Sequence, residues 1–159
     1  MSTEHHHTYP AHAHEAFPKE ALERVQKVVA EVERSTHVEL RISIRDQRDT
    51  PEAELSLEML AKKEFAHLGM HETKGHNGVL LFILYDERKF FVFADEGVHT
   101  KTSPDTWKDV ADTIRKHFRN AEFEAGLTAA LGRIEQHLKG VLPEVPKAEN
   151  ELSDEIAMR

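Results

Sequence analysis

Oxygen-bearing side chains stand at the ends of several apolar runs in this 159-residue chain. Asp95 and Glu96 follow one such run, Asn77 comes just before another, and Glu39 lies at the start of a third. Carboxylate and carboxamide oxygens are the ligands that hard divalent cations prefer in proteins. We therefore predict a weak Ca²⁺ or Mg²⁺ site built from separate loops, with these ligands: Asp95, Glu96, Glu39, Asn77 and Asp105.

The same residues also allow a purely structural interpretation. Glu39 would then pair with Arg41 on one face of a strand, and Asp95 and Glu96 would cap a loop. Catalytic signatures are missing, because the chain has no glycine–serine nucleophile elbow, no phosphate-binding loop and no dinucleotide fingerprint. We therefore expect a binding module rather than an enzyme.

Histidines offer a second kind of metal ligand. His37, His76 and His99 flank the same predicted edge, and three imidazoles with a carboxylate can form a zinc shell. These histidines are far apart in the sequence, whereas zinc ligands usually come in pairs a few residues apart. Zinc is therefore less favoured than calcium or magnesium. The N-terminal segment could chelate a transition metal through its own histidines, or form an idle tail: His5, His6, His7, His12 and His14.

Hydrophobic periodicity predicts the elements that position these residues. Three- and four-residue steps predict helices from Pro18, from Thr50-Pro51, from Ser103-Pro104 and after Asn120. Alternating or continuous apolar residues predict strands at 38–44, 78–85 and 89–94. The order helix-strand-helix-strand-strand-helix-helix predicts an α/β fold, a three-layer α/β/α sandwich with a small mixed sheet.

The connections between these strands predict which residues meet. A long helical crossover makes the first two strands parallel, and the short turn Asp86-Glu87-Arg88 makes the third antiparallel. The predicted cation ligands then share one edge of the sheet. The opposite edge is where open α/β sheets usually bind ligands. It carries a mixed set that indicates salt bridges, and we rank it second: Arg45, Asp46, Asp86, Glu87 and Arg88.

Composition limits the class of protein. The formal net charge of −8 argues against nucleic-acid binding, because no basic stripe offsets the acidic excess. The absence of cysteine excludes disulfides and thiolate chemistry. Residues 1–16 lack the apolar core of a secretory signal, and the longest apolar run is far shorter than the roughly 20 residues that span a bilayer. We expect a cytoplasmic location and no membrane span.

Polarity also predicts the domain boundaries. We expect one domain over residues 17–143. A histidine-rich tail, 1–16, comes before it and an acidic tail, 144–159, follows it. Both tails are expected to be disordered, because they offer little apolar surface to bury.

Several ordered motifs between Pro18 and Pro143 match one known family. They are Thr36–Ile42, Asn77–Leu80, Asp86–Phe90 and Asp95–His99, followed by Trp107, Phe118 and Glu124–Leu127. Together they resemble the TPM domain family, which includes thylakoid-lumen, photosystem-associated and bacterial proteins, and in particular its short soluble bacterial branch.

The resemblance implies a compact α/β/α domain. Relatives have been linked to divalent-cation binding, to phosphatase activity and to scaffold or chaperone-like roles. It therefore adds two alternatives to the cation-binding module. One is a metal-dependent phosphatase, in which Asp95 would hold a metal or attack phosphorus. The other is an interaction domain that binds a partner protein without metal.

Overall fold

The computed structural model describes residues 9–144 and 155–159, and its centre is a four-stranded sheet with the order β3-β2-β1-β4. β1 (Glu39–Arg45) and β2 (Gly78–Leu84) pair in parallel, and β3 (Lys89–Ala94) runs antiparallel to β2. The sequence predicts a helix in the crossover between the two parallel strands. That helix is α3 (Leu57–His67), as expected from the sequence.

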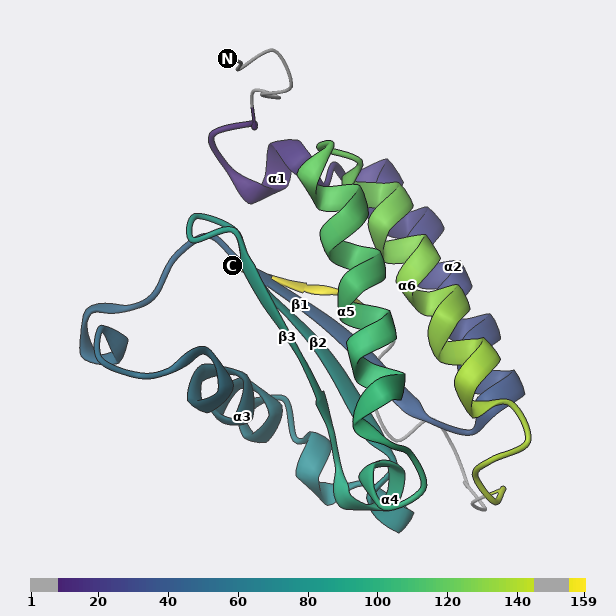
Figure 1. The fold of residues 1–159 in the computed structure, drawn as a ribbon. Helices are drawn as coiled ribbons and strands as arrows, with labels where there is room; N and C mark the ends of the chain where they lie inside the picture. The colour runs from purple at the N-terminus through teal and green to yellow at the C-terminus, as the bar shows by residue number, and fades with distance from the viewer. Residues whose placement is uncertain (1–8, 145–154) are drawn as a thin grey trace.

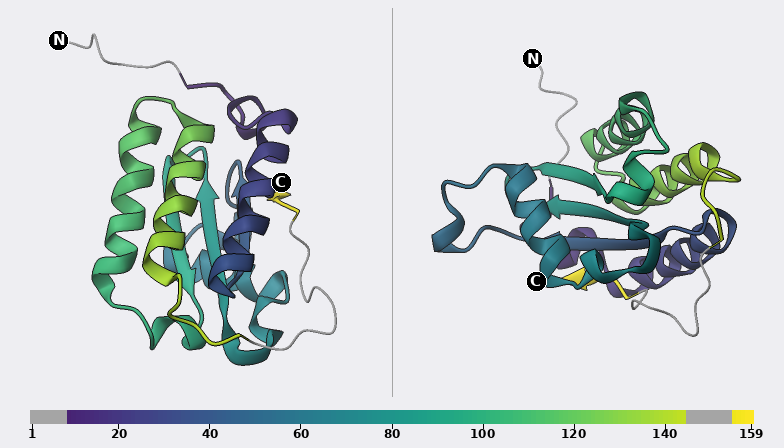
Figure 2. Two further views of the ribbon diagram at one scale, coloured as in Figure 1. Left: turned by 90° about the vertical axis from the view of Figure 1, so that its right-hand side faces the viewer. Right: turned by 90° about the horizontal axis from the view of Figure 1, so that it is seen from below.

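The helices cover the sheet on both faces (Figure 1). α2 (Lys19–Thr36), α5 (Pro104–Arg119) and α6 (Phe123–Leu138) form one layer, with α6 packed against both of the others. They stand side by side in front of the strands in the left view of Figure 2. α3 lies alone on the opposite face. The predicted three-layer α/β/α fold with a mixed sheet is confirmed.

Two apolar clusters follow from this arrangement. All seven residues of β2 are buried, and alternate side chains enter opposite clusters. Val79, Leu81 and Ile83 pack under the layer of three helices, whereas Leu80 and Phe82 pack under α3. Fully burying such a side chain stabilises a fold by roughly 1.5–3 kcal/mol. The central strand therefore fixes the position of both helical layers.

Two predicted helix starts differ from the structure. Thr50-Pro51 begins only a short 3₁₀ turn, η1 (Thr50–Glu52). α3 starts later, where the Ser56 hydroxyl accepts a hydrogen bond from the Met59 amide at 3.1 Å. Asn120 ends α5 instead of capping α6, since the chain passes through a left-handed residue, Ala121, before α6 begins. Proline and asparagine mark helix ends, but local contacts decide which end.

The expected disordered N-terminal tail is wrong for residues 9–16. This segment includes α1 (Ala13–Ala16), and the side chain of Ala13 is 1% exposed. The Tyr85 hydroxyl donates to the carbonyl of Pro10 at 2.6 Å, and burial raises the pKa of that phenol. The ring of Tyr9 packs edge-on against Phe123 at 5.0 Å. These aromatic contacts hold a polar segment on the core. Residues 1–8 lie outside the described part of the chain.

The expected C-terminal tail is likewise wrong at its end. β4 (Ala157–Met158) pairs in parallel with β1 and extends the sheet. The Arg159 guanidinium donates to Glu64, a carboxylate that is 2% exposed, at 2.7 Å. Only two residues pair in β4, which is too short for a periodic signal in the sequence. Residues 145–154 lie outside the described part.

Within residues 9–144 and 155–159, no helix has the length and apolar character needed to cross a membrane.

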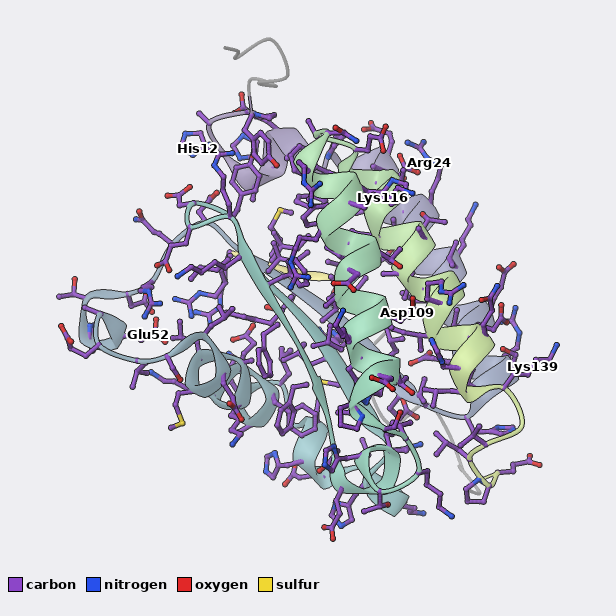
Figure 3. All side chains as sticks on the ribbon, in the orientation of Figure 1. His12, Arg24, Glu52, Asp109, Lys116 and Lys139 are labelled. Carbon is purple, nitrogen blue, oxygen red and sulfur yellow. The ribbon has the colours of Figure 1, made fainter. Side chains whose placement is uncertain are left out.

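A buried ion pair joins the end of β1 to η1. Arg45 donates to both carboxylate oxygens of Glu52, at 2.8 and 3.3 Å, and both side chains are nearly inaccessible to solvent. Figure 3 labels Glu52 on the loop that comes before α3. The hydrogen bonds from Arg45 hold the pKa of Glu52 at about 2, below its ordinary 4.5, although burial acts in the opposite direction. Removing one partner of such a pair leaves a buried charge uncompensated.

We expect Glu52→Gln to lower the free energy of unfolding by about 3 kcal/mol at neutral pH, because the buried Arg45 would keep only a longer contact, 3.5 Å, with the exposed carboxylate of Asp49. Urea unfolding of both proteins measures the difference. Glu124→Gln is the matched control, since Glu124 pairs with a largely exposed arginine, Arg24, and should have a small effect.

The pH dependence of this difference tests the ion pair itself. A carboxylate with a lowered pKa stabilises the fold above its unfolded-state value, and that contribution is lost as the pH falls from 4.5 towards 2. The gap between wild type and Glu52→Gln should therefore narrow between about pH 5 and about pH 3. A constant gap over that range would show that the charge of Glu52 does not matter.

Candidate functional site

Two of the predicted cation ligands lie on either side of a glycine at one end of the sheet. Glu39 is opposite Gly78 in the β1–β2 register, and the Asp95 amide donates to the Gly78 carbonyl at 2.8 Å from the other side. Glu39 is 2% exposed, and the side chain of Asp95 is 18% exposed. The parallel pairing of β1 with β2 and the return of β3 therefore bring these residues to one edge, as predicted.

Asn77 belongs to the same edge. Its backbone carbonyl accepts from the Glu39 amide at 3.0 Å, and its side-chain Nδ2 donates to the carbonyl of His37 at 2.7 Å. The residue is 4% exposed. The hydrogen bond from Nδ2 to His37 fixes the orientation of the Asn77 side chain, and with it the direction of Oδ1.

Asp95 also caps the short helix that follows it. Its Oδ1 accepts from the Glu96 amide at 2.8 Å at the start of α4 (Glu96–His99). Its Oδ2 lies 3.5 Å from Nδ1 of His76. The capping role agrees with the structural alternative considered from the sequence. It occupies one oxygen of the carboxylate, whereas the other accepts no hydrogen bond within the described residues and has the His76 ring as a more distant neighbour.

The loop before β2 closes tightly over this end of the sheet. Gly75 and His76, in the 3₁₀ segment η3 (Lys74–His76), both have positive φ angles, of 73° and 49°. A Cβ added at Gly97 would overlap with the carbonyl oxygen of Gly75 and lie 2.6 Å from that of His76. Two carbonyl groups are thus held against the first turn of α4. These carbonyls could not be predicted from the sequence, because every residue has a backbone oxygen and only Gly75 and Gly97 hint at the close approach.

The remaining predicted ligands are placed differently. Glu96 is exposed on α4, and Asp105 is exposed in the first turn of α5. His76 and His99 are exposed as well. Over the described ranges, no group of three or more His, Cys, Asp or Glu side chains is arranged to hold a metal ion. A site made of carboxylates and imidazoles alone is therefore not formed there.

The distinctive feature of this edge is a pair of buried acceptor oxygens. Asn77 Oδ1 and Asp95 Oδ2 are inaccessible to solvent and accept no hydrogen bond from the residues that the structure describes. Burying a polar atom without a partner costs about 1–3 kcal/mol. Most such atoms in native proteins have a partner, an ordered water or an ion. Asn77 lies just before the start of β2 and Asp95 just after the end of β3, so both oxygens belong to the same end of the sheet.

Taken together, the fold is an α/β/α domain with a crossover helix on one face, three helices on the other and buried side-chain oxygens at the β3–α4 exit. A model of the TPM domain matches residues 13–137 of the chain, which is most of its length. The chain therefore belongs to the TPM domain family. The family predicted from the sequence motifs is confirmed, and the match extends to α1.

Solved structures support the fold. The chain is similar over 99% of both chains to the BA42 protein from the psychrophilic bacterium Bizionia argentinensis, with 21% identity and a TM-score of 0.77. It is also similar to the N-terminal domain of a protein from P. gingivalis, with 25% identity, a TM-score of 0.61 and coverage of 80% of this chain and 81% of that one. No curated protein matches the chain.

A third similarity is more distant. The N-terminal domain of a Corynebacterium glutamicum protein shares 8% identity with a TM-score of 0.59, over 82% of this chain and 77% of that chain. At such identity the likeness concerns the fold alone. The arrangement of layers is thus kept where most side chains differ.

We expect Gly97→Ala to destabilise the protein, because the new methyl group would collide with the carbonyls of Gly75 and His76. The loss should reach about 1–3 kcal/mol in urea unfolding. Gly132→Ala in α6 is the control. A Cβ at Gly132 meets nothing within 4 Å, so this change should instead stabilise the helix by up to about 1 kcal/mol. Equal effects of both variants would mean that α4 does not press on the 75–76 loop.

Proposed function

We propose that this TPM domain is a non-catalytic module that binds a divalent cation, Ca²⁺ or Mg²⁺, at the β3–α4 exit. The observation that carries the proposal is the pair of buried oxygens, Asn77 Oδ1 and Asp95 Oδ2, which accept no hydrogen bond within the described ranges. A cation would bind to both and remove the cost of their burial. The expected cytoplasmic location stays a prediction.

The kinds of ligand at this edge support a hard cation. Calcium commonly takes six to eight oxygens from carboxylates, carboxamides, backbone carbonyls and water. Asp95 supplies a carboxylate oxygen and Asn77 a carboxamide oxygen, and Glu39 adds a second carboxylate at the same end of the sheet. The carbonyls of Gly75 and His76 lie next to the first turn of α4. Because this set includes a carboxamide and backbone carbonyls, it does not require three acidic or histidine side chains in one place, and the described residues contain no such group.

The same considerations narrow the ligands first predicted from the sequence. Asp95, Asn77 and Glu39 remain in the proposed site, because their side chains are buried or half-buried at one edge. Glu96 and Asp105 are exposed, so their part in the proposal is to attract the cation over a longer range. Zinc is less favoured, since His76 and His99 are exposed and carbonyl oxygens suit harder ions.

Titration with CaCl₂ and MgCl₂, followed through backbone amide NMR shifts, tests the proposal. We expect the largest shifts at residues 75–78 and 95–98, which surround the buried oxygens. Asp95→Asn and Asp95→Ser should both weaken binding by roughly tenfold or more. Serine still caps a helix, so the second variant keeps α4 in place while removing the free carboxylate oxygen.

Asp112→Asn is the matched control, because Asp112 is an exposed carboxylate on α5 that pairs with Lys108 and Arg115. Its metal affinity should equal that of the wild type. Absence of shifts near Asp95 at millimolar metal would refute the cation site, provided that the spectrum is that of a folded protein. The interaction-domain alternative would then be tested with a pull-down.

An assay with a generic phosphoester on the same protein separates binding from catalysis. We expect metal binding without turnover. Metal-dependent turnover that Asp95→Asn abolishes, and that changes in the N-terminal histidines leave intact, would instead favour the phosphatase hypothesis raised by the family resemblance. Turnover that separates from the protein on further purification would count against it.

A further inference from the structure

A cavity lies at the end of the sheet opposite the proposed cation site, and it shares no residue with that site. It encloses about 150 Å³ between the β2–β3 turn, the C-terminal end of α5 and the segment before α1. This end carries the C-terminal ends of the parallel strands β1 and β2, where ligands most often bind in open α/β sheets. In Figure 1 the β2–β3 turn lies at the opposite end of β2 from α4, and Figure 3 labels Lys116 near the C-terminal end of α5.

Aromatic rings form the inner wall of this cavity. They come from four separate parts of the chain, and they contact one another edge-on or at a tilt: Tyr9, Tyr85, Phe90, Phe118 and Phe123. Ring pairs in these geometries attract each other beyond simple burial. A further ring that enters the cavity would find both edges and faces to pack against. Its volume equals that of an apolar cavity large enough to hold benzene, about 150 Å³.

The rim of the same cavity is positively charged. Its charged lining residues are all cations, although the whole chain carries a net charge of −8: Arg88, Lys89, Arg115 and Arg119. Arg115 and Arg119 are four residues apart on α5, so they lie on one face of the helix. Arg88 comes from the β2–β3 turn on the other side. Cations therefore face the opening from two elements.

Two of these cations have no acidic partner among the residues that the structure describes. Arg115 pairs with Asp112 at 2.7 Å, and Lys89 lies 3.9 Å from Glu87. Arg88 and Arg119 make no ion pair with any residue in the described ranges. Both are exposed, and the Arg88 guanidinium lies 3.9 Å from the centre of the Tyr9 ring. A guanidinium held over a ring keeps its outer N–H groups for an anion.

The backbone at Arg88 adds a conformational observation. Its φ of 55° lies in the left-handed region, which a residue other than glycine adopts at a cost. In this conformation the Arg88 side chain stacks on the ring of Tyr9 at the cavity rim. From the sequence alone, Arg88 is expected only to take part in a turn and in salt bridges. Arg119 and the aromatic rings carry no signal of a shared site along the chain, because residues from positions 9 to 123 meet there only in the folded protein.

We propose that this cavity binds a small molecule with one aromatic ring and an anionic group, a phosphate or a carboxylate. The ring enters among the Phe and Tyr side chains, and the anion lies at the rim between Arg88 and Arg119. Guanidinium groups recognise phosphate and carboxylate by paired hydrogen bonds. The volume of about 150 Å³ matches a single ring, and the anionic group lies at the open rim. The site is independent of the cation site, which lies at the opposite end of β2.

Binding of four probes tests both halves of the proposal: phenyl phosphate, benzoate, inorganic phosphate and benzyl alcohol. Amide NMR shifts should map phenyl phosphate, benzoate or both to residues 85–90, 115–123 and the segment around Tyr9. The two aromatic anions separate a phosphate ligand from a carboxylate ligand. Inorganic phosphate lacks the ring and benzyl alcohol lacks the charge, so each should bind at least roughly tenfold more weakly than the better aromatic anion, a difference of 1.4 kcal/mol.

Arg88→Gln and Arg119→Gln should each weaken the better aromatic anion by about tenfold, the loss expected for one charge-assisted contact. Arg34→Gln is the matched control, because Arg34 is an exposed arginine near the end of α2 and away from the cavity. Its affinity should be that of the wild type. Urea unfolding curves of all three variants would verify that they are folded. We expect them to fold, because each replaced arginine is exposed on the surface.

Three results would overturn the proposal. Shifts that spread over the whole surface, or no shifts with either aromatic anion at millimolar concentration, would remove the site. Equal binding of inorganic phosphate would reduce it to a cationic patch. Equal binding of benzyl alcohol, or no effect of both arginine variants, would reduce it to an apolar cavity. Loss of calcium or magnesium binding in Asp95→Asn leaves these measurements unaffected, so the two proposals fail separately.

Discussion

The burial of β2 on both faces is the constraint on which the rest of the structure depends. Its seven residues are all buried, so each face of the strand must be covered by helices. Parallel pairing with β1 places the crossover helix α3 on one face, and α2, α5 and α6 close the other. Once both faces are covered, only the two ends of the sheet remain for polar side chains and ligands.

The two ends differ in chemistry because different elements meet at each. At the β3–α4 exit, the chain brings together a carboxylate, a carboxamide and tightly packed carbonyls, a set suited to a cation. At the β2–β3 turn, it brings arginines and aromatic rings together, a set suited to an aromatic anion. Seven strand residues at about 3.3 Å each separate the ends by roughly 20 Å. Direct contact between two such small ligands is therefore excluded.

The segments that were hardest to foresee are those held by a few long-range contacts. Residues 9–16 include three polar residues of the kind expected in a tail, His12, His14 and Glu15. Tyr9 and Ala13 nevertheless pack on the core, through ring contacts and a hydrogen bond from the Ala13 amide to Asp46 at 2.7 Å. β4 pairs through two residues only. Neither contact has a periodic signature, since it depends on a surface that exists only after the sheet has formed.

The sequence by itself determined the order of the helices and strands, the mixed sheet and the edge at which Glu39, Asn77 and Asp95 meet, because periodicity and connection length are local properties. Only the tertiary structure decided that Glu96 and Asp105 face solvent while Asn77 and Asp95 keep buried oxygens. It alone gathered Tyr9, Arg88 and Arg119 around one cavity. Burial and distance between remote residues are properties of the packed chain, and no spacing along the sequence encodes them directly.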